Sequence, residues 1–76
     1  MTYDEVIAIA LTNVGQRLRV TAPNGYQSVG VVGTWRNRSS GEVLPTLDNR
    51  LMGGEYDGMT AVEVMGANGR YKPAGD

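Results

Sequence analysis

The spacing of apolar residues changes once along this chain, at Gly15, and this change restricts the folds open to it. Before Gly15, apolar side chains recur every three or four residues, which is the spacing of one face of a helix. They are Tyr3, Val6, Ile7, Ala10, Leu11 and Val14. Thr2 and Glu5 have the spacing of a capping box, in which each residue's side chain accepts a hydrogen bond from the other's backbone amide. We therefore predict a helix over about residues 3 to 13, ended by Gly15.

After Gly15 the apolar period becomes two, which is typical of a strand with one buried face. Leu18, Val20 and Ala22 alternate with Arg17, Arg19 and Thr21. A turn is expected at Pro23-Asn24-Gly25, followed by a long second strand over residues 26–36 that forms a hairpin with the first. This second strand contains Gly30 and Gly33, which predict a bend or bulge, so that it serves two halves of the sheet.

Shorter strands are expected in the rest of the chain. Pro45 makes the strand around residues 43–47 a predicted edge strand, because proline lacks an amide donor. Further short strands are predicted at residues 51–52, 60–65 and 70–72, separated by turns and a glycine-rich acidic loop.

One helix and about five short strands predict an α+β fold, in which a strongly bent antiparallel sheet forms a small SH3-like β-barrel. The helix and a barrel over about residues 16–72 form a single domain over residues 1–72, followed by a flexible tail at 73–76. An OB-like barrel and an open α+β sheet covered by the helix fit the same pattern.

The chain of 76 residues contains neither cysteine nor histidine. It therefore lacks disulfides, thiolate nucleophiles and metal sites with sulfur or imidazole ligands, and we expect no cofactor and no metal. The acidic loop from Asp48 to Gly58 does not have the ligand spacing of a calcium loop. Because so short a chain buries a small core, self-association is the expected source of additional stability.

The N-terminal segment does not resemble a secretory signal, because acidic Asp4 and Glu5 precede a short apolar run. No apolar stretch approaches the length of a membrane span. We expect a protein of the cytoplasm or of a soluble assembly, not secreted and without a membrane partner.

Charge is segregated along the sequence. Between Glu5 and Glu42 there are arginines and no acidic residue, whereas from Glu42 to Met65 five acidic residues accompany Arg50 alone. If the fold places these halves on different surfaces, the molecule is dipolar and suited to oriented docking or head-to-tail contact.

Two groups of residues are candidates for partner binding. The first is Trp35 with Arg36 and Arg38, since an aromatic ring beside guanidinium groups can anchor a protein or stack on a base; packing of Trp35 in the core is the alternative. The second is Met52, Tyr56 and Met59, which have the composition of an interface and could equally fill the interior.

Catalysis is not expected, because Ser28, Ser39 and Ser40 have no histidine to act as a base. The sequence instead favours a non-enzymatic adaptor that docks on a protein partner, including a second copy of itself. Such a chain would suit an accessory protein of a bacterium or bacteriophage. The alternative is a nucleic-acid-binding module with a basic stripe of Arg17, Arg19, Arg36 and Arg38, although the net charge of −1 disfavours it.

Overall fold

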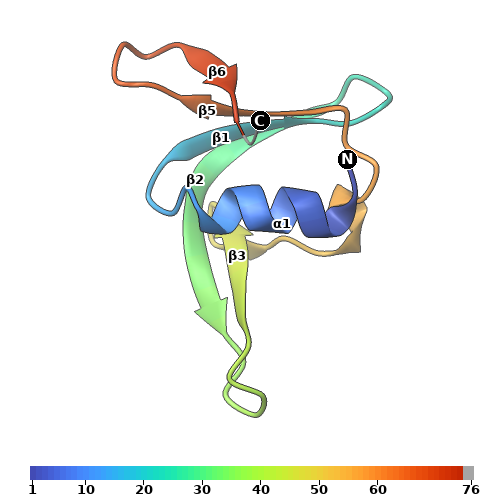
Figure 1. Cartoon of the computed structure of the whole chain (residues 1–76), viewed down its shortest axis with the longest axis vertical. Helices are drawn as coiled ribbons and strands as arrows, with labels where there is room; N and C mark the ends of the chain where they lie inside the picture. Colours follow the sequence, from blue (N-terminus) through green and yellow to red (C-terminus); the bar gives the residue numbers. More distant parts are fainter. Residues whose placement is uncertain (75–76) are drawn as a thin grey trace.

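The computed structural model describes residues 1–74 and shows an N-terminal helix packed on an antiparallel sheet (Figure 1). The helix α1 spans Tyr3–Leu11, and the 3-10 helix η1 spans Gly54–Tyr56. The strands are β1 (Arg17–Thr21), β2 (Gln27–Arg36), β3 (Val43–Leu47), β4 (Arg50–Leu51), β5 (Ala61–Met65) and β6 (Tyr71–Pro73). Their order in the sheet is β4-β3-β2-β1-β5-β6, so the small α+β fold expected from the sequence is confirmed.

The predicted capping box begins α1. The Glu5 amide donates to the Thr2 hydroxyl at 3.2 Å, and the Thr2 amide donates to a Glu5 carboxylate oxygen at 2.9 Å. The helix ends at Leu11, earlier than predicted, because two polar side chains compete for its last carbonyl groups. The Thr12 hydroxyl and the Asn13 side-chain amide both donate to the Ile9 carbonyl.

Strand β2 is shared between two parts of the sheet, as the glycines predict. Its first five residues pair with β1 and its last five pair with β3. A Cβ atom on Gly30 would lie 2.7 Å from the Asp48 carboxylate carbon, and one on Gly33 would lie 2.8 Å from the Thr46 hydroxyl. Both glycines therefore allow close approach of neighbouring side chains at the bend.

The hydrophobic core lies between α1 and the face of the sheet that carries the even-numbered residues of β1 and β5. Val6, Leu18 and Met52 are fully buried in it. Within residues 1–74, the buried core residues are Val6, Ile9, Ala10, Leu18, Val20, Val32, Leu47, Met52, Met59, Val62 and Val64.

The sheet is not closed into a barrel, in contrast to the predicted SH3-like closure. Over residues 1–74, β4 and β6 lie at opposite ends of the strand order and do not pair with each other. Closure fails because β4 has only two residues, after which the chain leaves the sheet and enters η1. The open α+β sheet covered by the helix is the arrangement observed.

One smaller expectation, on β3, also needs correction. Strand β3 is not an edge strand, because β4 pairs with its last two residues, Thr46 and Leu47. Pro45 lies beyond those pairs, opposite Thr34, so its missing amide does not interrupt them. The predicted tail includes Pro73, which ends β6, and Ala74, whose amide donates to the Val62 carbonyl at 3.0 Å; the rest of it lies outside the described residues.

Among residues 1–74, no helix has the length and apolar character needed to cross a membrane.

Candidate functional site

The face of the sheet turned away from the core carries exposed apolar side chains on β2 and β4. Val29, Val31 and Trp35 alternate with the core residue Val32, so they project from the opposite face. Gly33, on that same face, is paired with Thr46, and Thr46 is paired with Leu51. Register partners share a face of a sheet, which places Leu51 with Val31 and Trp35. We call Val29, Val31, Trp35 and Leu51 the outer patch.

Trp35 lies on an arm formed by the end of β2 and the start of β3, which extends beyond the body of the molecule (Figure 1). It is 44% exposed. The sequence placed Trp35 on one face with Val29 and Val31, and the structure shows that this is the solvent face rather than the core face.

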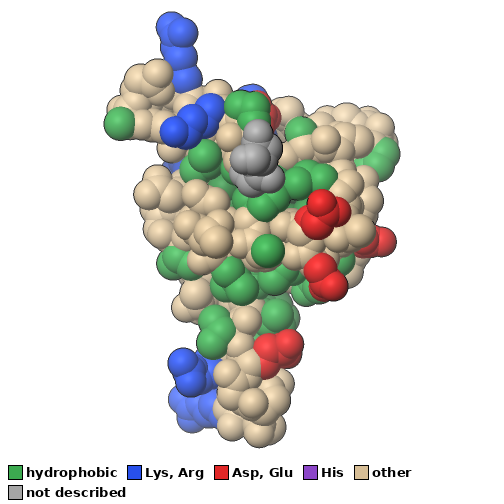
Figure 2. Space-filling model, in the orientation of Figure 1, with side chains coloured by type: hydrophobic (Ala, Val, Ile, Leu, Met, Phe, Trp, Pro, Cys, Tyr) green, Lys and Arg blue, Asp and Glu red, His purple; other side chains and the backbone are tan. Residues whose placement is uncertain are grey.

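Arg36 and Arg38 lie at the tip of the arm. Arg36 ends β2, and Arg38 lies in the following turn, where the Asn37 side chain accepts a hydrogen bond from the Ser39 amide at 2.9 Å. Both arginines are unpaired among the described residues, because the one ion pair found there joins other side chains. The tip is the basic region at the lower end of Figure 2.

The structure does not assemble the basic stripe predicted for nucleic acid. Arg19 forms an ion pair with Glu63, with 2.9 Å between Nε and Oε1, and its guanidinium lies 4.3 Å from the centre of the Tyr71 ring. Arg17 is paired in register with Val31, five positions before Arg36 on β2, and Arg36 projects from the other face of that strand. The four arginines therefore do not form one surface.

The Arg19–Glu63 pair affects the ionisation of both groups. The guanidinium that donates to Glu63 holds the pKa of that carboxyl below its ordinary value of 4.5. The same hydrogen bond raises the pKa of Arg19. Glu63 therefore remains charged to a lower pH than a free glutamate.

Met52, Tyr56 and Met59 do not form one exposed group. Met52 is 0% exposed and Met59 is 7% exposed. Tyr56 is partly buried and packs against the core. Of the two sequence interpretations, the structure shows the one in which the methionines fill the interior, and only Tyr56 reaches the surface.

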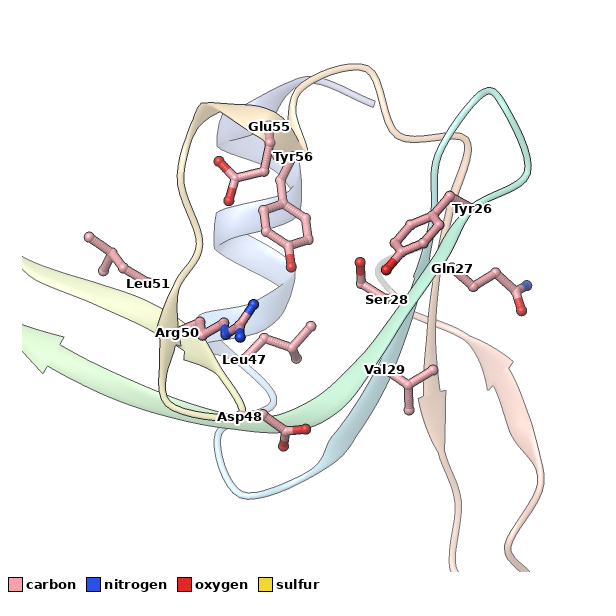
Figure 3. A pocket seen from close by; sticks show the side chains of 10 residues that line it. All are labelled: Tyr26, Gln27, Ser28, Val29, Leu47, Asp48, Arg50, Leu51, Glu55 and Tyr56. Carbon is pink, nitrogen blue, oxygen red and sulfur yellow. The ribbon is translucent and has the colours of Figure 1, made fainter.

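A hollow of about 610 Å³ lies between the start of β2 and the segment that contains β4 and η1 (Figure 3). Tyr26 stands on the β2 side of the hollow and Tyr56 on the η1 side. The guanidinium of Arg50 points into it, and Asp48 and Glu55 also line it. A smaller apolar recess of about 230 Å³, lined by Val20 and Met59 among others, adjoins the hollow and shares Tyr26 and Tyr56 with it.

The sequence interpretation did not find this hollow. Tyr26 and Arg50 are 24 positions apart and belong to different turns of the chain. No local pattern indicates that they face each other, because their proximity depends on the bend in β2.

Two of the three acidic side chains in the loop, those of Asp48 and Asp57, have structural partners. Asp48 accepts a hydrogen bond from the Val31 amide at 2.9 Å, and Asp57 accepts one from the Tyr3 amide at 2.8 Å. Within residues 1–74, no three histidine, cysteine or carboxylate side chains are grouped so that they could hold a metal ion. The Asp48 and Asp57 carboxylates thus support neighbouring backbone.

On the face drawn in Figure 2, basic side chains lie at both ends of the long axis. Figure 2 shows basic side chains at the tip of the arm and over the β5–β6 hairpin, with acidic side chains between them on the side where α1 begins. The basic residues of the hairpin are Arg70 and Lys72. This face is therefore not divided into one basic half and one acidic half.

Comparison with protein-family models, with curated proteins and with solved structures finds no match for this chain.

Proposed function

We propose that this chain is a non-catalytic binding protein that docks on a protein partner through Trp35 and the outer patch. The observation that carries the proposal is the exposure of Trp35 on a projecting arm. Tryptophan and arginine are the residues most enriched among those that dominate protein–protein affinity. A half-exposed tryptophan with unpaired arginines nearby therefore favours a contact site.

The residues around Trp35 have the composition of an ordinary protein–protein interface, with apolar side chains surrounded by charged ones. Val31 and Leu51 add apolar area, being 41% and 45% exposed. Arg36 and Arg38 at the tip would form a charged rim, which steers encounter more than it adds to affinity. A second copy of the chain is one such partner.

The types of side chain present support a non-catalytic role. Histidine and cysteine are absent from the sequence. Ser28 lines the hollow, but the single lysine, Lys72, is paired with Val64 near the far edge of the sheet. A serine nucleophile would therefore have no neighbouring amine or imidazole base.

The test is capture of partners from a lysate of the source organism, with and without nuclease, using wild-type protein and the Trp35→Ala variant. We expect a protein partner that survives nuclease treatment and is lost with Trp35→Ala. The double substitution Arg70→Glu and Lys72→Glu serves as a control, because it changes charge at the opposite end of the molecule and should leave the partner bound.

Nucleic-acid binding is the competing outcome. Short single-stranded and double-stranded DNA and RNA should bind weakly or not at all at physiological salt. Submicromolar binding that falls linearly with the logarithm of salt concentration, and that is lost when the four arginines of the predicted stripe are replaced, would overturn the proposal.

A further inference from the structure

The first part of β2 has a free edge on the side of the hollow. In an antiparallel pair, the backbone groups of successive residues point alternately toward and away from the partner strand. On the β1 side, the Tyr26 carbonyl accepts from Ala22 at 2.8 Å, and the Val32 amide donates to Gln16 at 2.9 Å. The even-numbered residues of β2 therefore bond to β1, and the odd-numbered residues point away from it.

The odd-numbered residues do not all have partners. Both backbone groups of Val31 are hydrogen-bonded to Asp48. The Val31 carbonyl accepts from the Asp48 amide at 3.0 Å, and the Val31 amide donates to the Asp48 carboxylate. Beyond this point the chain turns away into β4. The amide and carbonyl groups of Gln27 and Val29 bond to none of the described residues and border the hollow.

The hollow also presents one cation. The Arg50 guanidinium points into it and has no ion-pair partner among residues 1–74. Neither of the nearby carboxylates, Asp48 and Glu55, forms an ion pair with this guanidinium. Asp48 and Glu55 line the hollow as well, but the Asp48 carboxylate accepts from the Val31 amide, and a Glu55 oxygen lies 2.8 Å from the place of a Cβ on Gly53.

We propose that the hollow binds an extended peptide segment of a partner protein, which pairs as an added strand with the free edge at Gln27 and Val29 and places an acidic side chain against Arg50. Backbone pairing would supply affinity, as it does when a peptide adds a strand to a sheet edge. The carboxylate complements the unpaired guanidinium, which can hold it through two hydrogen bonds.

The adjoining apolar recess predicts a second feature of the peptide, an apolar side chain. Arg50 is paired with Leu47 and so shares the core side of the sheet with it. The apolar recess, bordered by Val20 and Met59, opens on that side as well. Side chains two positions apart in a strand point the same way, so the peptide should carry an apolar residue two positions from its acidic one.

This site does not include Trp35, although Val29 and Leu51 border the hollow and also belong to the outer patch. Trp35→Ala therefore tests the proposed function without altering this site, and Arg50→Glu tests this site without altering the outer patch.

The test is selection from a library of displayed random nonapeptides on the full chain, followed by fluorescence anisotropy with the selected peptides. We expect enrichment of peptides with an acidic residue two positions from an apolar one. Arg50→Glu should lower their affinity by about tenfold or more, as expected when an attractive charge pair becomes repulsive, and should shift a repeated selection toward basic peptides.

Val29 provides the variant that tests strand addition. Val29→Pro removes the amide that points into the hollow and leaves the bonds between β1 and β2 intact, since proline is tolerated where the amide faces solvent. Val29→Thr keeps the amide and is the matched control. We expect Val29→Pro to lose peptide binding and Val29→Thr to retain it, with both proteins folded by circular dichroism.

Three results would overturn the proposal. One is a selection that enriches no peptide. Another is enrichment of peptides without the acidic residue. The third is equal binding to Val29→Pro and Val29→Thr, which would show that the hollow holds side chains without strand pairing.

Discussion

At the residue scale, the capping box at the start of α1 is the clearest link between sequence and stability. Thr2→Ala removes the hydroxyl that accepts from the Glu5 amide. We expect the free energy of unfolding to fall by about 0.5 to 2 kcal/mol, as for other N-cap replacements. Urea denaturation checks this, and an unchanged midpoint would contradict it. Thr2→Ser, which keeps the hydroxyl, should retain the wild-type midpoint.

The Arg19–Glu63 pair makes a pH-dependent contribution to stability. The pKa of Glu63 is lowered in the folded protein from its ordinary value of 4.5, so the folded state binds its proton less readily than the unfolded state. Its stabilising contribution is therefore complete well above pH 4.5 and is lost as the pH falls through the lowered pKa.

The comparison that checks this is wild type against Glu63→Gln from pH 7 down to pH 3. We expect the difference in unfolding free energy between the two proteins to shrink as the pH falls below 4.5. A difference that stays constant over this range would show that the pair contributes nothing through ionisation. The effect should also weaken in high salt, because the pair is partly exposed.

Gly30 tests the close approach at the bend. In Gly30→Ala, the new methyl group would lie 2.7 Å from the Asp48 carboxylate carbon and would displace the carboxylate that accepts from Val31. We expect a loss of about 1 to 3 kcal/mol, typical of overpacking. Gly54→Ala is the matched control, since nothing lies within 4 Å of its Cβ position, and it should be neutral or raise stability by up to about 1 kcal/mol. Equal effects of the two substitutions in chemical denaturation would contradict this account.

At the scale of secondary-structure elements, Met52 joins the segment after β4 to the core. Its side chain is fully buried, and its carbonyl accepts from the Tyr3 hydroxyl at 2.9 Å. Met52→Ala should cost about 2 to 5 kcal/mol through lost burial and a residual cavity. The adjacent, exposed Leu51 gives the control, because Leu51→Ala should change stability by less than about 0.5 kcal/mol. Thermal melts that fall equally for both would show that Met52 is not a core residue.

Local patterns predicted most of the elements. The capping box and the 3.6-residue period marked α1, the alternation around Leu18 and Val20 marked β1, and Gly30 and Gly33 marked the bend in β2. Each of these signals lies within a few residues of the element it specifies. Their success reflects the agreement of local propensity with the final fold.

Closure of the sheet and the composition of the site were harder to predict from the sequence, because they depend on contacts between distant segments. Barrel closure requires the two end strands to meet, and nothing in the short segments at residues 50–51 and 71–73 encodes that pairing. Alternation placed Trp35 with Val29 and Val31, but only the packing of α1 decides which face is solvent. The ion pair of Arg19 likewise depends on β5 lying beside β1.

At the scale of the whole molecule, the outer patch leads us to expect weak self-association. Val31, Trp35 and Leu51 are between 41% and 45% exposed on one face, and exposed apolar groups gathered in this way mark contact surfaces. The melting temperature should therefore rise with protein concentration, as in any folded state stabilised by association.

Sedimentation equilibrium checks this expectation. Leu51→Lys should shift the protein toward monomer by placing a charge in the outer patch. Val14→Lys, at an apolar residue that is 48% exposed outside the sheet, should not. A strict monomer at high concentration, or an equal response to both substitutions, would remove the outer patch as the surface of association.

The position of β1 between β2 and β5 also governs how the chain folds. The contact between β1 and β2 closes a short turn, but Arg19 and Glu63 are separated by 44 positions. The loop-closure entropy of this pairing must be overcome before β5 contributes its contacts, so the rate-limiting step should be the arrival of β5 at the preformed hairpin. Folding should accordingly take milliseconds to seconds, the range typical of small β-rich domains dominated by distant contacts.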